Sequence, residues 1–138
     1  MKLFFKIFTR IHIALYRLTN GLLGSQMRGM PVLLLTTRGR KTGRIWTTPV
    51  MYIQSAGHYI IAASNNGMNH HPAWFLNLQA NPEVEIEIMD QKIKTEAALV
   101  PEDKYDQYWE QLTQQAPFFE GYKKSRSLPI PLVELRPL

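Results

Sequence analysis

The 138-residue chain contains no cysteine, and no aspartate or glutamate occurs before Glu83. The absence of cysteine excludes disulfides, thiolate catalysis and cysteine-bound zinc, and it fits a reducing compartment such as the cytoplasm. All 11 acidic residues lie from Glu83 onward, whereas most of the 16 lysines and arginines precede it. This separation of charge predicts that the first part of the chain meets an anionic partner.

The N-terminal segment also lacks an uninterrupted run of about 20 apolar residues, which a membrane-crossing helix would need. No small-residue cleavage site follows it, so a signal peptide is not expected. Lys2, Lys6 and Arg10 recur every four residues beside an apolar stripe of Phe4, Ile7, Phe8, Ile11, Leu15 and Leu18. This spacing predicts an amphipathic helix within residues 1–24, ended by Asn20-Gly21 and Gly24. Two alternatives remain open: the helix packs on the domain, or residues 2–19 contact the inner face of an anionic membrane.

Residues 25–138 are expected to form one α+β domain, because short apolar strands there alternate with turn residues and two helical stretches. About six mostly antiparallel strands are expected, in a small, partly opened barrel with two helices besides the N-terminal one. The expected strands are 31–37, 45–53, 58–63, 83–89, 92–100 and 132–135, and the helices are 73–80 and 102–115. Pro49 predicts an edge position or a bulge. Glu83, Glu85 and Glu87 alternate with apolar residues, which predicts a wet strand face.

The strongest candidate site is the turn between the first two expected strands. Arg38, Arg40, Lys41 and Arg44 lie there around Gly39 and Gly43, with Thr42 beside them. Guanidinium groups, an ammonium, a hydroxyl and backbone N–H groups freed by glycine suit a phosphate-bearing ligand. The spacing is not that of a Walker loop. An anionic cofactor or substrate, nucleic acid, and a solvated turn without function are the alternatives; nucleic acid is disfavoured because no recognition-helix motif is present.

Weaker candidates lie further along the chain. The Ala62–Asn69 loop precedes Pro72, Ala73 and Trp74, and a loop that opens a helix can hold an anion. His58, His70 and His71 do not predict a metal site, because no ligand motif accompanies them. Phe118, Phe119 and Tyr122 are expected in a loop, where exposed aromatic residues often line a pocket.

Four segments taken together resemble the deazaflavin (F420)-dependent nitroreductase family. They are LLLTTRGRKTGRIWTTPVMY, AASNNG, HPAWFLNLQANPEVEIEI and LPIPLVELRP, and the similarity spans roughly residues 10 to 137. The most specific pieces are TxGRKTG and the WxLNLxANPxVxV-like run. This resemblance implies a split β-barrel related to FMN-binding folds, and hydride transfer from reduced F420 to a quinone-like or nitro acceptor.

The resemblance also implies roles for individual residues. Arg40, Lys41, Thr42 and Gly43, supplemented by Arg44, would grip the phosphate and glutamyl tail of F420. Pro49, Ala62, Ala63, Ser64 and Asn65 would lie beside the deazaflavin ring, with Ala73, Trp74 and Asn77 near the same groove. Phe119 and Tyr122 would line the substrate side. Ser64 and Tyr122 are the catalytic candidates, as donors to the anion that develops during hydride transfer.

Two positions depart from the family pattern. Trp46 stands where an arginine is usual, and Asn65 stands where a lysine is usual; both cations normally help to hold the negative tail. Loss of one charge-assisted contact typically costs about 1.5–3 kcal/mol. Two alternatives to an F420 enzyme therefore remain: a reductase of the same fold that uses FMN, and a non-catalytic carrier of a cofactor or small molecule. Either a monomer or a homodimer is compatible with the sequence.

Overall fold

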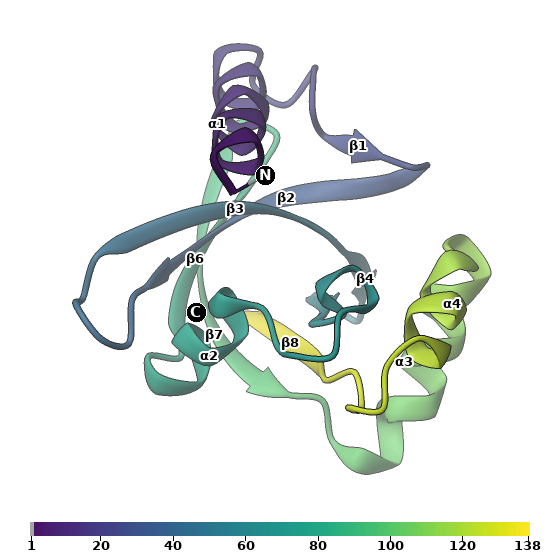
Figure 1. The fold of residues 1–138 in the computed structure, drawn as a ribbon. Helices are drawn as coiled ribbons and strands as arrows, with labels where there is room; N and C mark the ends of the chain where they lie inside the picture. The colour runs from purple at the N-terminus through teal and green to yellow at the C-terminus, as the bar shows by residue number, and fades with distance from the viewer. Residues whose placement is uncertain (1) are drawn as a thin grey trace.

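A computed structural model, which describes residues 2–138, contains one curled, eight-stranded antiparallel sheet with helices around it (Figure 1). The strand order is β1-β2-β6-β7-β8-β5-β4, and β3 pairs with β2 off this path. The strands are β1 (Gln26–Met27), β2 (Met30–Arg38), β3 (Ile45–Met51), β4 (Ile53–Ser55), β5 (His58–Ala62), β6 (Glu83–Ile88), β7 (Gln91–Leu99) and β8 (Leu132–Pro137). The helices are α1 (Lys2–Leu18), α2 (Ala73–Ala80), α3 (Glu102–Gln115) and α4 (Phe118–Lys124), with a 3₁₀ turn η1 (Asn65–Gly67).

The expected α+β architecture is confirmed, with two additional short strands. The segment expected as one strand over 45–53 is divided at Tyr52 into β3 and β4, and β1 is too short to leave a periodic pattern. In the described chain β3 pairs only with β2, with Pro49 opposite Leu34. The edge position expected from Pro49 is therefore confirmed, since an edge strand tolerates a missing N–H donor.

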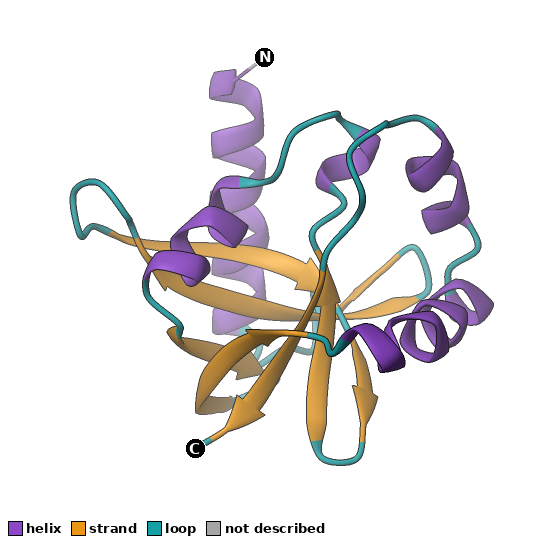
Figure 2. Cartoon of the chain, turned by 90° about the horizontal axis from the view of Figure 1, so that it is seen from below, coloured by secondary structure: helices purple, strands orange, loops and turns teal. Residues whose placement is uncertain are grey.

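The expectation of a loop at residues 118–122 is wrong. These residues form α4, which begins after Pro117 and packs beside α3 on one side of the sheet (Figure 2). Local sequence favours this helix only weakly, because it has seven residues and includes Gly121. Its position is fixed by Phe119, which is buried among Tyr108, Trp109 and Leu112 of α3.

Two apolar clusters hold the sheet. One lies between the sheet and α3–α4 and includes Ile53, Ile60, Trp109, Phe119 and Leu132. The other fills the inside of the half-barrel and is closed by Phe75 and Leu78 of α2. Cluster members of β5 and β8 alternate between the two, so Ile60 and Leu132 belong to the first while Ile61 and Val133 belong to the second. This is the period of two expected of strands that are buried on both faces.

Helix α1 is joined to the sheet by Tyr16, whose side chain is fully buried. Its single O–H is shared between the carbonyls of Val32 (3.1 Å) and Glu87 (3.2 Å), and its oxygen accepts from the N–H of Met89 (2.8 Å). Burial raises the pKa of the Tyr16 phenol, so it stays protonated. Helix α1 therefore packs on the domain, which was the first of the two alternatives for it. In the described residues no helix has the length and apolar character needed to cross a membrane.

The wet strand face expected for the glutamates of β6 is wrong at its end. Glu83 is exposed, but Glu87 is only 7% exposed and lies 3.4 Å from Nε of Arg17 in α1. The helix covers this end of the strand, so the carboxylate is buried beside a cation. The alternation in the sequence gives the face of the strand correctly, but it cannot indicate which part of that face another element covers.

Candidate functional site

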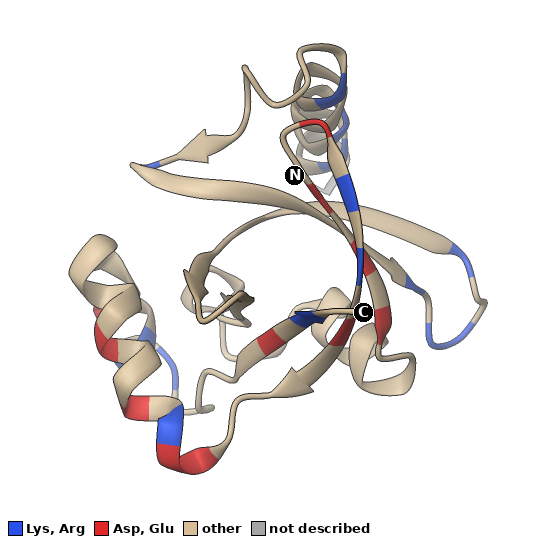
Figure 3. Cartoon of the chain, turned by 180° about the vertical axis from the view of Figure 1, so that it is seen from behind, with Lys and Arg blue, Asp and Glu red and all other residues tan. Residues whose placement is uncertain are grey.

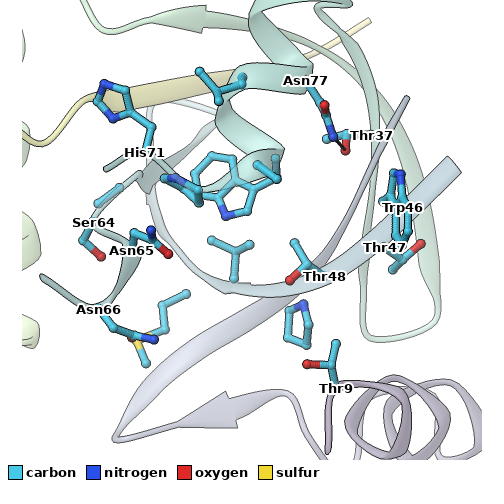
Figure 4. Close-up of a pocket in the computed structure, with 18 of the residues that line it drawn as sticks. Thr9, Thr37, Trp46, Thr47, Thr48, Ser64, Asn65, Asn66, His71 and Asn77 are labelled. Atoms are coloured by element: carbon cyan, nitrogen blue, oxygen red, sulfur yellow. Dashed lines mark hydrogen bonds between the residues drawn. The ribbon is translucent and has the colours of Figure 1, made fainter. Parts of the chain in front are cut away.

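A cavity of about 1170 Å³ opens between the β2–β3 ribbon, the start of α2, α4 and one side of α1. Its wall includes Thr37, Trp46, Thr47, Thr48, Ser64, Asn65, Asn66, His71 and Asn77, and it also includes Thr9 from α1 (Figure 4). A drug-sized or cofactor-sized ligand needs roughly 300–1,000 Å³. The cavity is therefore large enough for an extended ligand and a second molecule beside it.

The basic turn closes one end of this cavity. The N–H of Gly39 donates to the carbonyl of Arg44 (2.7 Å), and the N–H of Gly43 donates to the carbonyl of Gly39 (2.9 Å). Gly43 has φ +75°, a conformation that glycine adopts at little cost. Among the described residues, no carboxylate lies within 4.0 Å of Arg40, Lys41 or Arg44. Figure 3 shows these cations at the tip of the ribbon, well separated from the acidic residues of α3.

Asn77 attaches the turn to α2. Its Oδ1 accepts from the backbone N–H of Arg40 (3.2 Å) and from Nη1 of the same residue (2.9 Å), while its Nδ2 donates to Oγ1 of Thr37 (3.4 Å). The amide is 4% exposed. A neutral acceptor orients the Arg40 guanidinium without cancelling its charge, so the cation remains available to an anion.

The loop after β5 has an unusual backbone that its sequence explains. Asn65, Asn66 and Gly67 have φ values of +50°, +55° and +80°. Asparagine and glycine tolerate this left-handed region better than other residues do. The Asn65 side chain donates from Nδ2 to the carbonyl of His70 (3.0 Å), which holds the loop closed. Asn65 therefore has a structural role in this loop.

Arg126 supports this loop from behind and was not singled out by the sequence patterns. It is 7% exposed, and its guanidinium donates to four carbonyls: Ser64 (3.0 Å), Met68 (3.1 Å), Leu128 (2.7 Å) and Pro129 (2.6 Å). Burial lowers the pKa of Arg126, and no carboxylate of the described chain pairs with it. A buried, unneutralised cation thus lies directly behind the Ser64 carbonyl.

The start of α2 adds a partial positive charge. Pro72 is the N-cap and provides no side-chain hydrogen bond, and Ala73 and Trp74 follow it on the cavity wall. The first N–H groups of a helix have no partner within the helix and favour an anion nearby. Together with the basic turn and Arg126, they make one side of the cavity electropositive.

Aromatic rings line the opposite side. The ring centres of Phe118 and Phe119 lie 4.8 Å apart with the ring planes inclined at 28°, and the Tyr122 ring meets that of Phe119 edge-on at 5.6 Å. All three line the cavity, although Phe119 is buried. A flat apolar molecule fits against such a surface.

The histidines take separate positions. His58 pairs with Glu134 on the sheet, and His71 lies 4.8 Å from the ring of Phe75. Nδ1 of His71 is buried and has no hydrogen-bond partner among residues 2–138, and burial, together with the Arg126 charge, lowers the pKa of His71. No group of three acidic or histidine side chains that could hold a metal ion occurs among residues 2–138.

The cavity brings together most of the site residues expected from the sequence. Those on its wall are Arg40, Lys41, Thr42, Pro49, Ala62, Ser64, Asn65, Ala73, Trp74, Asn77, Phe119 and Tyr122. Three expected residues are not on the wall. Ala63 is fully buried in the half-barrel cluster, Gly43 shapes the turn, and Arg44 lies over the Trp46 ring at 5.4 Å.

Several wall residues were missed by sequence reasoning. Thr47 and Thr48 lie on β3, and Phe5, Phe8, Thr9 and His12 come from α1. The threonines could have been suspected, since they are polar residues just after the basic turn. The sequence of α1 does not indicate that this helix lines the cavity, because its position there depends on the burial of Tyr16 against the sheet.

The family model described as F420H(2)-dependent quinone reductase matches residues 8–137. The chain belongs to this family. An F420H(2)-dependent quinone reductase of Mycobacterium tuberculosis is 38% identical over 130 residues, which cover 91% of this chain and 87% of the relative. A second M. tuberculosis relative, also named for F420H(2)-dependent quinone reduction, is 30% identical over 108 residues.

Solved structures confirm the split-barrel fold. An F420-H2-dependent reductase superimposes with a TM-score of 0.70 at 27% identity, covering 77% of this chain and 94% of the other. A domain-swapped dimer superimposes with a TM-score of 0.72 at 26% identity, covering 86% and 87% of the two chains. The haem storage protein HutZ of Vibrio cholerae, at 22% identity and a TM-score of 0.62, shares the fold.

Proposed function

We propose that this quinone reductase family member uses reduced F420 to reduce a quinone-like acceptor in the cavity. The observation that carries the proposal is the juxtaposition of unneutralised cations at one side with an aromatic wall at the other. The first side suits a long, negatively charged cofactor, and the second suits a flat, apolar acceptor.

The residues present fit the cofactor that the family name implies. Arg40, Lys41 and Thr42 would hold its phosphate-bearing tail, while Ser64, Asn65 and Trp74 would border its ring. When bound, reduced F420 supplies a hydride; the acceptor gains that hydride together with one proton from the reduced ring or solvent. The chain contributes position and electrostatics. We assign Ser64 and Tyr122 as donors to the oxygen on which negative charge develops.

The two departures from the family pattern are consistent with a working site. Trp46 removes one cation, but Arg44 lies over its ring and Arg126 adds charge behind the loop. Asn65 removes another cation, and its side chain closes the loop instead. Binding of F420 is accordingly expected to depend on Arg40 and Lys41 more strongly than in relatives with all the cations.

The test is a titration of the purified protein with F420, followed by fluorescence polarisation, and then a turnover assay with F420H2 and menadione. Saturable binding with turnover supports the enzyme. Binding without turnover would favour a carrier, and a protein purified with a chromophore that has the absorption spectrum of FMN rather than that of F420 would favour the FMN alternative. Arg40→Gln should weaken binding, with Arg136→Gln as a control because Arg136 lies on β8 away from the cavity wall.

Peripheral membrane contact through residues 2–19 is proposed as an additional property. Exposed Phe4, Ile7, Ile11 and Leu18 form an apolar strip on α1, flanked by Lys6 and Arg10. Phe5 and Phe8 of the same helix line the cavity, so a lipid-soluble acceptor could pass directly from a bilayer into it. Such an arrangement suits a helix that lies in the interface of an anionic membrane.

The burial of Tyr16 determines which variants can test membrane contact without unfolding the domain. Deletion of the helix would also remove Tyr16, so the double variant Lys6→Gln, Arg10→Gln and the single variant Phe4→Asp are better choices. Both should reduce cosedimentation with vesicles containing phosphatidylglycerol, and binding of the unaltered protein should fall with salt. Equal sedimentation of all three proteins would exclude this contact.

A further inference from the structure

Arg28, in the turn between β1 and β2, contacts two residues of α4. Its Nη1 donates to the hydroxyl oxygen of Tyr122 (2.7 Å), and its Cζ lies 3.7 Å from the centre of the Phe118 ring. Met27, Phe118 and Tyr122 all line the cavity, so the contact lies at its edge. In the described chain β1 pairs only with β2 and lies at the end of the strand order. The Arg28 side chain connects this hairpin to α4.

The backbone at Arg28 is strained. Met27 pairs with Met30, so Arg28 and Gly29 are the two turn residues, with φ values of +51° and +80°. Tight hairpin turns of this kind favour asparagine and glycine, and an arginine in the left-handed region costs about 1 kcal/mol. Asparagine or glycine would suit this turn position better than arginine does. The Arg28 side chain, however, makes two contacts with α4, one to Tyr122 and one to Phe118. Strain of this kind is a reason to look for function.

The contact constrains the proton of Tyr122. A guanidinium can only donate, so the phenol oxygen accepts from Arg28 and its own O–H must point elsewhere. Arg28 is the hydrogen-bond partner of that hydroxyl in the described chain. The O–H is left free for a carbonyl oxygen in the cavity, and a donor that already accepts a charge-assisted bond is a stronger donor.

We infer that Arg28 is a positioning residue for the acceptor: it fixes the Tyr122 ring and presents the phenolic proton to a carbonyl oxygen of a quinone-like molecule. Arg28 acts on the acceptor side alone, because its contacts are with the aromatic wall and not with the basic turn. This inference rests on the proposed function, and it names the residue that controls acceptor binding within it.

The test uses Arg28→Asn, Tyr122→Phe and the double variant. Asparagine suits the positive φ, so the hairpin should remain folded while the contact is lost. The KM for menadione should rise about five- to tenfold in Arg28→Asn, as expected for one lost charge-assisted contact. The F420 dissociation constant should stay within about twofold, because the electropositive side of the cavity is unchanged. In the Tyr122→Phe background, Arg28→Asn should have little further effect.

Lys123→Ala is the matched control. Lys123 is also on α4 and lies over an aromatic ring, that of Trp109 at 5.1 Å, but it does not line the cavity. Its loss should leave the KM for menadione unchanged. An equal rise in Lys123→Ala, an undiminished effect of Arg28→Asn in the Tyr122→Phe background, or an unchanged KM would each overturn the inference.

A second measurement separates this inference from the proposed function. Quenching of tryptophan fluorescence by menadione, without cofactor, reports on binding of menadione in the cavity independently of F420, since Trp46 and Trp74 line its wall. Weaker quenching in Arg28→Asn would support the role of Arg28 even if F420 did not bind. Unchanged quenching together with normal F420 binding would refute that role and leave the proposed function intact.

Discussion

The Arg40 side chain in the turn between β2 and β3 donates to Oδ1 of Asn77 in α2 at 2.9 Å, across 37 positions of sequence. The same oxygen accepts from the backbone N–H of Arg40. A neutral amide thus holds both the turn and its guanidinium while leaving the positive charge unneutralised. Orientation without charge cancellation is what recognition of an anionic ligand requires.

Asn77→Asp tests this relationship. A carboxylate can accept the same two hydrogen bonds, so the turn should remain ordered, but it would neutralise the guanidinium. We expect F420 to bind about tenfold more weakly, because one charge-assisted contact is worth about 1.5–3 kcal/mol. The free energy of unfolding at neutral pH should be similar to that of the wild type. Asn77→Ala should instead reduce both affinity and stability, and unchanged affinity in Asn77→Asp would contradict the role given to Arg40.

Trp46→Arg should tighten F420 binding. Trp46 is half-exposed on the cavity wall, at the position where the resemblance to the deazaflavin-dependent family implies an arginine. A guanidinium there should lower the dissociation constant about tenfold or more, and the gain should shrink as salt rises. Ile45→Arg is the control, because Ile45 is equally exposed on the same strand but does not line the cavity. Equal tightening by both variants would show a general effect of charge.

Arg126→Lys should destabilise the protein although it conserves charge. One ammonium cannot reach four carbonyls with the geometry of a guanidinium, so buried acceptors would lose their donors. The free energy of unfolding in urea should fall by about 2–4 kcal/mol, since each hydrogen bond to a charged group contributes about 1.5–3 kcal/mol. Arg136→Lys should change it by less than about 0.5 kcal/mol, because the Arg136 side chain is half-exposed. Similar losses in the two variants would argue against a special role for Arg126.

Stability should depend on pH through His71. Burial and the charge of Arg126 lower its folded pKa below the ordinary value of 6.5. The unfolded chain therefore binds a proton at pH values where the folded chain does not. This contribution is fully present above pH 6.5 and is lost as the pH falls from there toward the folded pKa. Urea unfolding at several pH values between about 5 and 7.5 should show this slope.

The matched variants for the pH effect are His71→Gln and His70→Gln. His71→Gln should flatten the dependence below pH 6.5, since the titrating group is removed. His70 is the exposed neighbour, and its replacement should leave the slope in place. A slope that persists in His71→Gln would assign the pH dependence to another group.

Local sequence patterns predicted much of the fold. The alternation in β6, the buried run in β2 and the apolar spacing in α1 each follow from a fixed geometric period, so these elements were found with little error. The glycine-flanked turn, with its cations and no nearby acid, also identified one side of the site. Side-chain chemistry within a few residues was sufficient for these predictions.

Local patterns failed where a distant element decided the outcome. The helix at Phe118–Lys124 has a weak intrinsic preference and depends on the burial of Phe119 against α3. Glu87 resembled its solvent-facing neighbours until α1 covered it and brought Arg17 to 3.4 Å. In both cases the missing information was which surface packs on which.

The sequence by itself determined most of the longer elements, the family and the concentration of positive charge, because each of these depends on residue identity and short-range spacing. Tertiary structure alone decided that Asn77 orients Arg40, that Arg126 lies behind Ser64 and that Arg28 reaches Tyr122. These pairs are separated by 37, 62 and 94 positions, and no local period relates them. They exist because curling the sheet brings the basic turn, the loop after β5 and α4 around one cavity.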